Sequence, residues 1–162
     1  MNKCLLILSL MVVLFAYKSS AKTFKLSSKS DRTIQSGIKG NWQITQVSYP
    51  ASDYIMVNSF QIADSKCFVG STWNFIPDNN KGSLRLKQSV KCSSFSSPIV
   101  WSIDKNGKFG LEIIEVEVKS KKVMLGYLLN ITNKTDTSFQ LVDINNVGGQ
   151  DKEITYQFEK MN

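Results

Sequence analysis

Gly40-Asn41-Trp42 opens the first of about eight short segments in which apolar and polar residues alternate, and these segments follow one another as far as Lys160. Alternation with a period of two residues is typical of β-strands that bury one face. Asp104-Lys105-Asn106-Gly107 lies between two such runs and is a strong signal for a hairpin turn. The connections are short and contain no long amphipathic helix, so neighbouring strands are predicted to be antiparallel.

A meander of this length hides its strand edges best by closing on itself, and eight strands enclose room for side chains or one small ligand. We therefore predict an all-β fold, an eight-stranded antiparallel up-and-down barrel. A two-sheet sandwich stays the alternative, because the sequence does not show whether the first and last strands pair. The longest connection is 52–66, where residues 57–63 are predicted to form a short helical segment over a barrel mouth.

Local breaks in the alternation add detail to the predicted barrel. The apolar positions change phase by one residue between Ile113 and Ile114, which predicts a bulge. Residues 91–97 are rich in serine and are predicted to be a loop that ends at Pro98. Later strands are predicted at 123–131, 137–144 and 153–160.

The first 21 residues have the pattern of a signal peptide: a basic start, a mostly apolar run over 4–16 and small residues at Ser19-Ser20-Ala21. Residues 22–37 are predicted to be a flexible Ser/Lys-rich tether and 38–162 a single barrel domain. We expect an exported protein, periplasmic or secreted. No transmembrane segment is expected in the mature chain, since crossing takes about 20 apolar residues. Lipid anchoring is a minority alternative, because Tyr17 stands where a lipoprotein needs a cysteine.

Export to an oxidising compartment makes the cysteines informative, and Cys67 and Cys92 are the two outside the leader. They are predicted to form one disulfide, which would stabilise the domain by about 3 kcal/mol by closing a loop of about 25 residues. Two separately buried thiols are the alternative. Lys66 and Lys91 precede the cysteines in polar, loop-like sequence, which favours the bridge.

Composition argues against several classes of function. The formal charge is +7, and Lys3 and Lys18 belong to the leader, so the mature domain carries 7 − 2 = +5. These charges are scattered, whereas nucleic-acid binding usually shows a basic stripe, so no nucleic-acid partner is expected. The chain has no histidine, no phosphate-binding glycine loop and no Gly-x-Ser-x-Gly motif. We expect neither an enzyme nor a bound cofactor or metal.

Some acidic residues still have two interpretations. Glu115 and Glu117 share a strand face and are predicted to be solvated. Asp78, Asn80 and Gly82 faintly match a calcium loop but are predicted to form a turn. Asp143 follows two apolar residues on an inward register, so it either binds a polar ligand group or lies beyond the barrel rim; the rim is the favoured prediction.

The stretch Cys67-Phe68-Val69-Gly70-Ser71-Thr72-Trp73-Asn74-Phe75, after a Gly-x-Trp and before a second cysteine, resembles a family of small bacterial lipocalin-like envelope proteins. The resemblance covers roughly 38–160 and implies a calycin-type barrel that binds a small apolar molecule. Two features depart from the family: Tyr17 replaces the lipoprotein cysteine, and the last strand offers Lys152 and Lys160 instead of an arginine to stack on Trp42.

Within this barrel, Gly40 and Trp42 are predicted to form the barrel-closing motif, with Trp42 plugging the closed end rather than contacting ligand. The candidates for lining the lumen share inward-consistent registers: Trp73, Phe75, Leu84, Leu86, Trp101, Leu111, Leu125, Tyr127, Phe139, Leu141, Tyr156 and Phe158. The leading hypothesis is a carrier of a small hydrophobic ligand. The alternative is a barrel filled by its own aromatic side chains that docks an envelope protein partner.

Overall fold

The computed structural model describes residues 37–50, 56–117, 120–147 and 149–162. The signal peptide predicted for 1–21 lies outside the described residues, and so does the predicted tether apart from Gly37.

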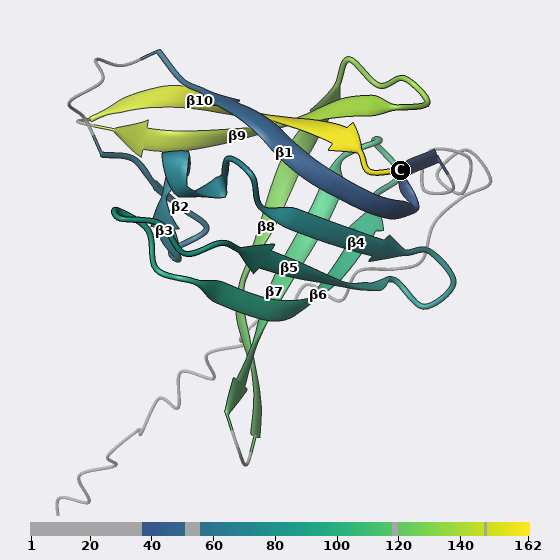
Figure 1. Cartoon of the computed structure of the whole chain (residues 1–162). Coiled ribbons are helices and arrows are strands. Elements are labelled where there is room, and N and C mark those ends of the chain that lie inside the picture. Colours follow the sequence, from purple (N-terminus) through teal and green to yellow (C-terminus); the bar gives the residue numbers. More distant parts are fainter. Residues whose placement is uncertain (1–36, 51–55, 118–119, 148) are drawn as a thin grey trace, which may run out of the picture.

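Eight antiparallel strands close into a barrel in the order β1-β10-β9-β8-β7-β6-β5-β4 (Figure 1). β1 pairs with β4 on one side and with β10 on the other, so the barrel prediction is confirmed and the sandwich alternative is wrong. The strands are β1 (Gly40–Ser48), β4 (Thr72–Ile76), β5 (Lys81–Leu86), β6 (Phe95–Ile103), β7 (Phe109–Glu117), β8 (Ser120–Thr132), β9 (Ser138–Val147) and β10 (Gln150–Lys160).

The long first connection differs from its predicted form. Residues 57–63 contain no helical turn; they form a small hairpin of β2 (Asn58–Ser59) and β3 (Ala63–Asp64). The helical segment follows it as the 3₁₀ helix η1 (Ser65–Phe68), whose first turn is capped where the Asp64 side chain accepts a hydrogen bond from the Lys66 N–H at 2.8 Å. The connection still covers a barrel mouth, as expected.

The predicted bulge is confirmed, because the β7–β8 register shifts between Glu112 and Ile114. The predicted loop at 91–97 is wrong in its last residues, since β6 begins at Phe95 and runs through Pro98. Ser97 occupies an inward position on this strand, and its hydroxyl is satisfied by the carbonyl oxygen of Ile114. A serine at a core position hides the alternation that would have identified the start of the strand.

Aromatic rings fill the half of the barrel that begins at residues 37–42, which we call the closed end. Phe139 stacks on Phe158 with ring centroids 4.6 Å apart. Trp42 makes a T-shaped contact with Phe139, with centroids 4.7 Å apart. Farther round the wall, Trp101 lies 5.2 Å from Phe75 and stacks on Phe109 at 5.7 Å. Interlocked rings of this kind pack as densely as an organic crystal, so this half of the barrel is a solid core.

Trp42 is anchored at the closed end by contacts on three sides. Its indole N–H donates to the Ile38 carbonyl oxygen at 2.7 Å, and its ring packs against Phe139. The Lys160 ammonium lies 5.8 Å from the ring centroid, within cation–π range. Lys160 thus lies over the ring on the side where the family resemblance implied an arginine. Gly40 precedes this site with a φ of +110°, a conformation that favours glycine.

Candidate functional site

The opposite end of the barrel, which we call the mouth, is occupied by residues 57–68, the plug. Its backbone closes on itself where the Ser65 N–H donates to the Val57 carbonyl oxygen at 2.7 Å. A chain of buried hydroxyls ties it to the wall: the Tyr156 hydroxyl donates to Ser59 Oγ at 2.6 Å, and Ser59 Oγ lies 2.6 Å from Ser65 Oγ. Ser65 in turn donates to the Val57 carbonyl oxygen. These hydrogen bonds hold the plug in a defined position against the barrel wall.

Phe60, at the tip of the plug, inserts its ring among four other aromatic side chains. The ring centroids of Tyr127 and Tyr156 each lie 5.1 Å away, that of Phe68 lies 5.3 Å away and that of Trp73 lies 6.3 Å away. Only 3% of Phe60 is exposed. The ring thus fills the space between the plug and the barrel wall at the mouth.

The turn that presents Phe60 is strained. Phe60 and Gln61 have φ angles of 53° and 55°, and the Ile62 N–H donates to the Ser59 carbonyl oxygen across them. Two successive left-handed residues are typical of type I′ turns, which normally use Asn and Gly. Each left-handed residue other than glycine costs about 1–2 kcal/mol. The packing of the Phe60 ring must offset this strain for the plug to stay in place.

The plug is also attached covalently. Cys67, in η1, is bonded to Cys92 with Cα atoms 5.6 Å apart, so the structure contains the predicted disulfide. A groove of about 590 Å³ lies over this bridge and is bordered by Met56 and Val90. Met56 is 80% exposed and Val90 is fully exposed, so the rim of this groove is apolar.

The ladder between β8 and β9 stops before the mouth, and we call the stretch where the two strands are unpaired the lateral gap. These strands pair through Asn130, Ile131 and Thr132 near the closed end. Toward the mouth, the described part of β8 pairs with β7 alone, whereas residues 143–147 pair with β10. Figure 1 shows β8 and β9 diverging there. Leu128 and Ile144, one on each strand, are exposed large apolar residues beside this lateral gap.

Polar groups face the inside of the barrel next to the gap. Asp143 is only 9% exposed and pairs with the fully buried Ile154, so the prediction that it lies beyond the rim is wrong. Its carboxylate accepts hydrogen bonds from the Ile144 N–H at 2.9 Å and from the Asn145 side-chain amide at 3.1 Å. The Tyr127 hydroxyl is buried and has no hydrogen-bond partner among the described residues.

The electrostatics of these groups reflect their burial. Loss of solvation raises the pKa of Asp143, and the hydrogen bonds from Ile144 and Asn145 oppose this shift. Burial also raises the pKa of Tyr127, and the negative charge of Asp143 raises it further. For Tyr156, burial raises the pKa and the hydrogen bond to Ser59 partly opposes it. The mouth therefore combines two phenols with a carboxylate whose charged form is disfavoured by burial.

The lumen candidates are placed together by the structure, with one exception. The Leu125 side chain lies outside the described residues. Tyr127 is partly buried at the mouth, and the remaining ten are buried members of one core: Trp73, Phe75, Leu84, Leu86, Trp101, Leu111, Phe139, Leu141, Tyr156 and Phe158. Most of them contact each other, and Tyr127 and Tyr156 are the candidates that lie nearest the mouth, against Phe60.

Sequence reasoning missed Phe60, Ser59 and Ser65. Ser59 and Ser65 are polar residues with no apolar periodicity around them, and Phe60 sits in a turn that lacks the usual turn residues. The one available signal was position, because the prediction already placed their segment over the mouth.

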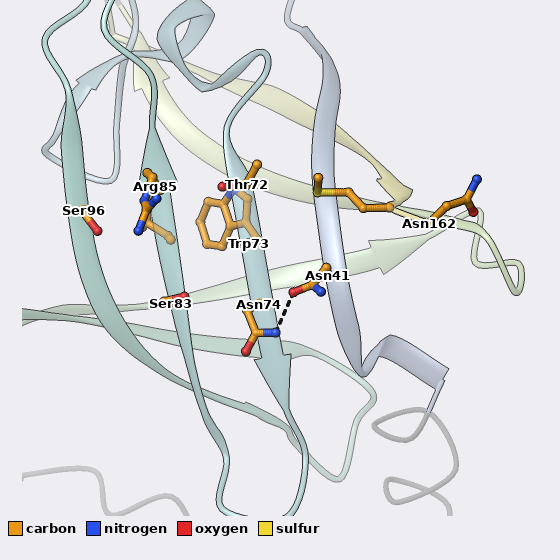
Figure 2. A pocket seen from close by; sticks show the side chains of 10 residues that line it. Asn41, Thr72, Trp73, Asn74, Ser83, Arg85, Ser96 and Asn162 are labelled. Carbon is orange, nitrogen blue, oxygen red and sulfur yellow. Dashed lines mark hydrogen bonds between the residues drawn. The ribbon is translucent and has the colours of Figure 1, made fainter.

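A second hollow lies on the outer face of the barrel and is shown in Figure 2. It has a volume of about 340 Å³ and spans the outward side chains of β1, β4 and β5, where the Asn74 side-chain amide donates to Asn41 Oδ1 at 2.7 Å (Figure 2). Its lining is largely polar, and it contains no buried charged side chain. This groove offers little apolar surface for binding.

The described residues contain neither a cluster of metal ligands nor a membrane-spanning helix. Within 37–50, 56–117, 120–147 and 149–162, no three His, Cys, Asp or Glu residues gather as metal ligands would. In the same ranges, no helix has the length and apolar character needed to span a membrane.

A closed, eight-stranded, up-and-down barrel is the architecture of the lipocalins. The model of the lipocalin-like domain family matches residues 38–141. The chain therefore belongs to the lipocalin-like domain family, a fold typically associated with ligand binding rather than catalysis.

Three solved structures show the similarity at low identity. Bovine odorant-binding protein in complex with a selenium-containing odorant is 16% identical, over 88% of this chain and 78% of that one, with a TM-score of 0.44. The complex of bovine odorant-binding protein with undecanal is 14% identical, over 85% and 78%, with a TM-score of 0.43. A dog lipocalin allergen is 17% identical, over 75% and 72%, with a TM-score of 0.41. No curated protein gave a significant match.

Proposed function

We propose that this chain is an exported lipocalin-like protein that binds a small hydrophobic molecule at the barrel mouth, in the space that the Phe60 ring now occupies. The observation that carries the proposal is the position of Phe60: one ring, held by a strained turn, fills a cage of aromatic side chains beside a lateral gap. A guest that replaces this ring recovers the aromatic contacts, and the turn is then free to relax. Buried apolar ligand surface contributes about 25 cal/mol per Å².

The solid closed end limits the size of this ligand. Rings from Trp42 to Trp101 fill that half of the barrel, so the ligand is restricted to the mouth. An apolar cavity of about 150 Å³ suffices to hold a benzene molecule. We therefore expect ligands of about the size of one aromatic ring with a short extension.

The test compares binding to the purified mature domain and to its Phe60→Ala variant. A hydrophobic fluorescent probe should bind the variant about tenfold more tightly, because the probe no longer competes with the internal ring. Equal binding, or none to either protein, would contradict the proposal. Native mass spectrometry of protein purified from its source, with and without organic extraction, should in addition reveal an extractable adduct.

Export is supported by the leader-like first 21 residues and by the disulfide, which persists in oxidising compartments. N-terminal sequencing of the protein from its source should begin at Lys22. A chain that retains Met1 and stays in the reducing cytosol would contradict export.

The alternative function is a filled barrel that docks another envelope protein. The observation in its favour is the apolar groove over the disulfide, where Met56 and Val90 are exposed. A Val90→Asp substitution should abolish co-purification of such a partner without changing probe binding at the mouth. Loss of probe binding instead would place the ligand in this groove.

A further inference from the structure

Asp143 carries a buried carboxyl group whose hydrogen-bond donors in the described residues are both neutral. They are the backbone N–H of Ile144 and the amide of Asn145, so each carboxylate oxygen receives one hydrogen bond and retains a free lone pair. A buried carboxylate is costly unless a cation pairs with it. Part of its role is structural, because it caps the Ile144 N–H at the edge that β8 leaves unpaired. An asparagine would provide that cap equally well without a charge.

Tyr127 and Tyr156 complete the surroundings of this carboxylate. On the β9–β10 ladder, Asp143 pairs with Ile154 and Tyr156 pairs with Leu141, so Asp143 and Tyr156 are diagonal neighbours on the inward face. Tyr127 contributes the buried hydroxyl without a partner among the described residues. A phenol hydroxyl both donates and accepts hydrogen bonds, so a polar group on a ligand beside it would satisfy a buried group that otherwise has no partner in the described residues.

Four aromatic rings line the space that Phe60 fills. The Phe60 centroid is 5.1 Å from the ring centroids of both Tyr127 and Tyr156, and Phe68 and Trp73 lie 5.3 Å and 6.3 Å away. Tyr127 and Tyr156 carry phenol hydroxyls; burial raises their pKa values, and they lie close enough to Asp143 for its charge to raise them further. Phe68 and Trp73 carry no charge. A ligand that replaces the Phe60 ring therefore meets apolar rings and the groups around Asp143.

We infer that the mouth binds a small apolar amine, whose apolar part replaces the Phe60 ring against Phe68 and Trp73 and whose ammonium group faces Asp143, Tyr127 and Tyr156. This inference rests on the proposed function, and it names the chemical class of the ligand. An ammonium group donates hydrogen bonds to the carboxylate and to the Tyr127 hydroxyl, and it supplies the positive charge that the described hydrogen-bond partners of Asp143 lack.

The experiment uses two ligands of nearly equal shape, 2-phenylethylamine and 2-phenylethanol, because their phenyl group matches the side chain that leaves. Calorimetric titration of the mature protein and of Phe60→Ala is expected to show the amine binding about tenfold more tightly than the alcohol. Phe60→Ala should bind both ligands more tightly than the unmodified protein does. In the Phe60→Ala background, Asp143→Asn should weaken amine binding about tenfold and change alcohol binding less than about twofold.

Asp151→Asn is the matched control, because it removes the same charge from an exposed position of β10, where the carboxylate accepts from the Asn146 side-chain amide. It should leave amine binding unchanged, and circular dichroism should show that both variants fold. Equal affinities for amine and alcohol, or no effect of Asp143→Asn, would overturn the amine class and leave the proposed function intact. If neither ligand binds either protein, both the inference and the proposed function fail.

Discussion

Replacing Phe60 by alanine is the most informative perturbation of this protein, because it should lower stability and open the mouth at once. Only 3% of Phe60 is exposed, and its ring contacts four other aromatic rings. A buried phenylalanine removes about 200 Å² from water, worth about 5 kcal/mol at 25 cal/mol per Å². Measured Phe→Ala losses in cores are about 3–5 kcal/mol. We expect about 3–4 kcal/mol here, since the plug can move toward the vacated space.

A comparison of glycine with alanine at position 60 separates the loss of packing energy from the relief of backbone strain. Alanine keeps the cost of the left-handed conformation, whereas glycine removes about 1–2 kcal/mol of strain and adds about 0.5–1 kcal/mol of chain entropy. Phe60→Gly should therefore be equal in stability to Phe60→Ala or slightly more stable, the reverse of the usual order.

The assay is urea unfolding followed by tryptophan fluorescence, with the free energy of unfolding extrapolated to water. Phe109→Ala is the control, because Phe109 is equally buried but lies in the closed end against Trp101. It should lose a similar free energy and gain no probe binding. A loss below about 1 kcal/mol for Phe60→Ala would refute the description of Phe60 as the packed tip of the plug.

Three further outcomes are expected. Replacing Cys67 and Cys92 by serine should lower the free energy of unfolding by about 3 kcal/mol and weaken protection of the plug in hydrogen exchange; unchanged stability would contradict this. Asp143→Asn should stabilise the protein at pH 7, because the raised pKa means that the ionised carboxyl group destabilises the folded state and asparagine removes this cost. In urea unfolding the gain in stability should vanish below about pH 4, where the carboxyl group is protonated in both states. A gain in stability confined to acid pH would refute this reasoning. Gln61→Gly should stabilise by about 0.5–1 kcal/mol, whereas Gln46→Gly on β1 should destabilise; thermal unfolding of the pair compares them.

Local patterns were sufficient for much of the fold. Alternation and the Asp104 to Gly107 turn predicted antiparallel strands, because the side-chain period of a strand and the chemistry of a tight turn are written in adjacent residues. The turn forms as expected, with the Asp104 carboxylate accepting from the backbone N–H groups of Asn106 and Lys108. The phase change after Ile113 likewise predicted the bulge.

Other local features were hidden because a tertiary contact replaced the expected residue type. Ser97 sits in the core because a carbonyl oxygen of β7 satisfies its hydroxyl. Phe60 and Gln61 form a turn without glycine or asparagine because aromatic packing around Phe60 offsets the backbone strain. No rule based on neighbouring residues predicts such a compensation, since its source lies on β8 and β10.

The sequence by itself determined antiparallel strands, two cysteines able to form one disulfide and a set of inward-facing aromatic residues, because periodicity, turns and cysteine number are properties of the chain. Only the tertiary structure decided that the first and last strands pair to close the barrel, that the two cysteines are bonded, and how the aromatic interior is used. It filled the closed end with rings, placed Phe60 across the mouth, and separated β8 from β9 beside Asp143 and Tyr127. Burial raises the pKa of Asp143 and of Tyr127, and burial depends on which strands pack together in the folded protein.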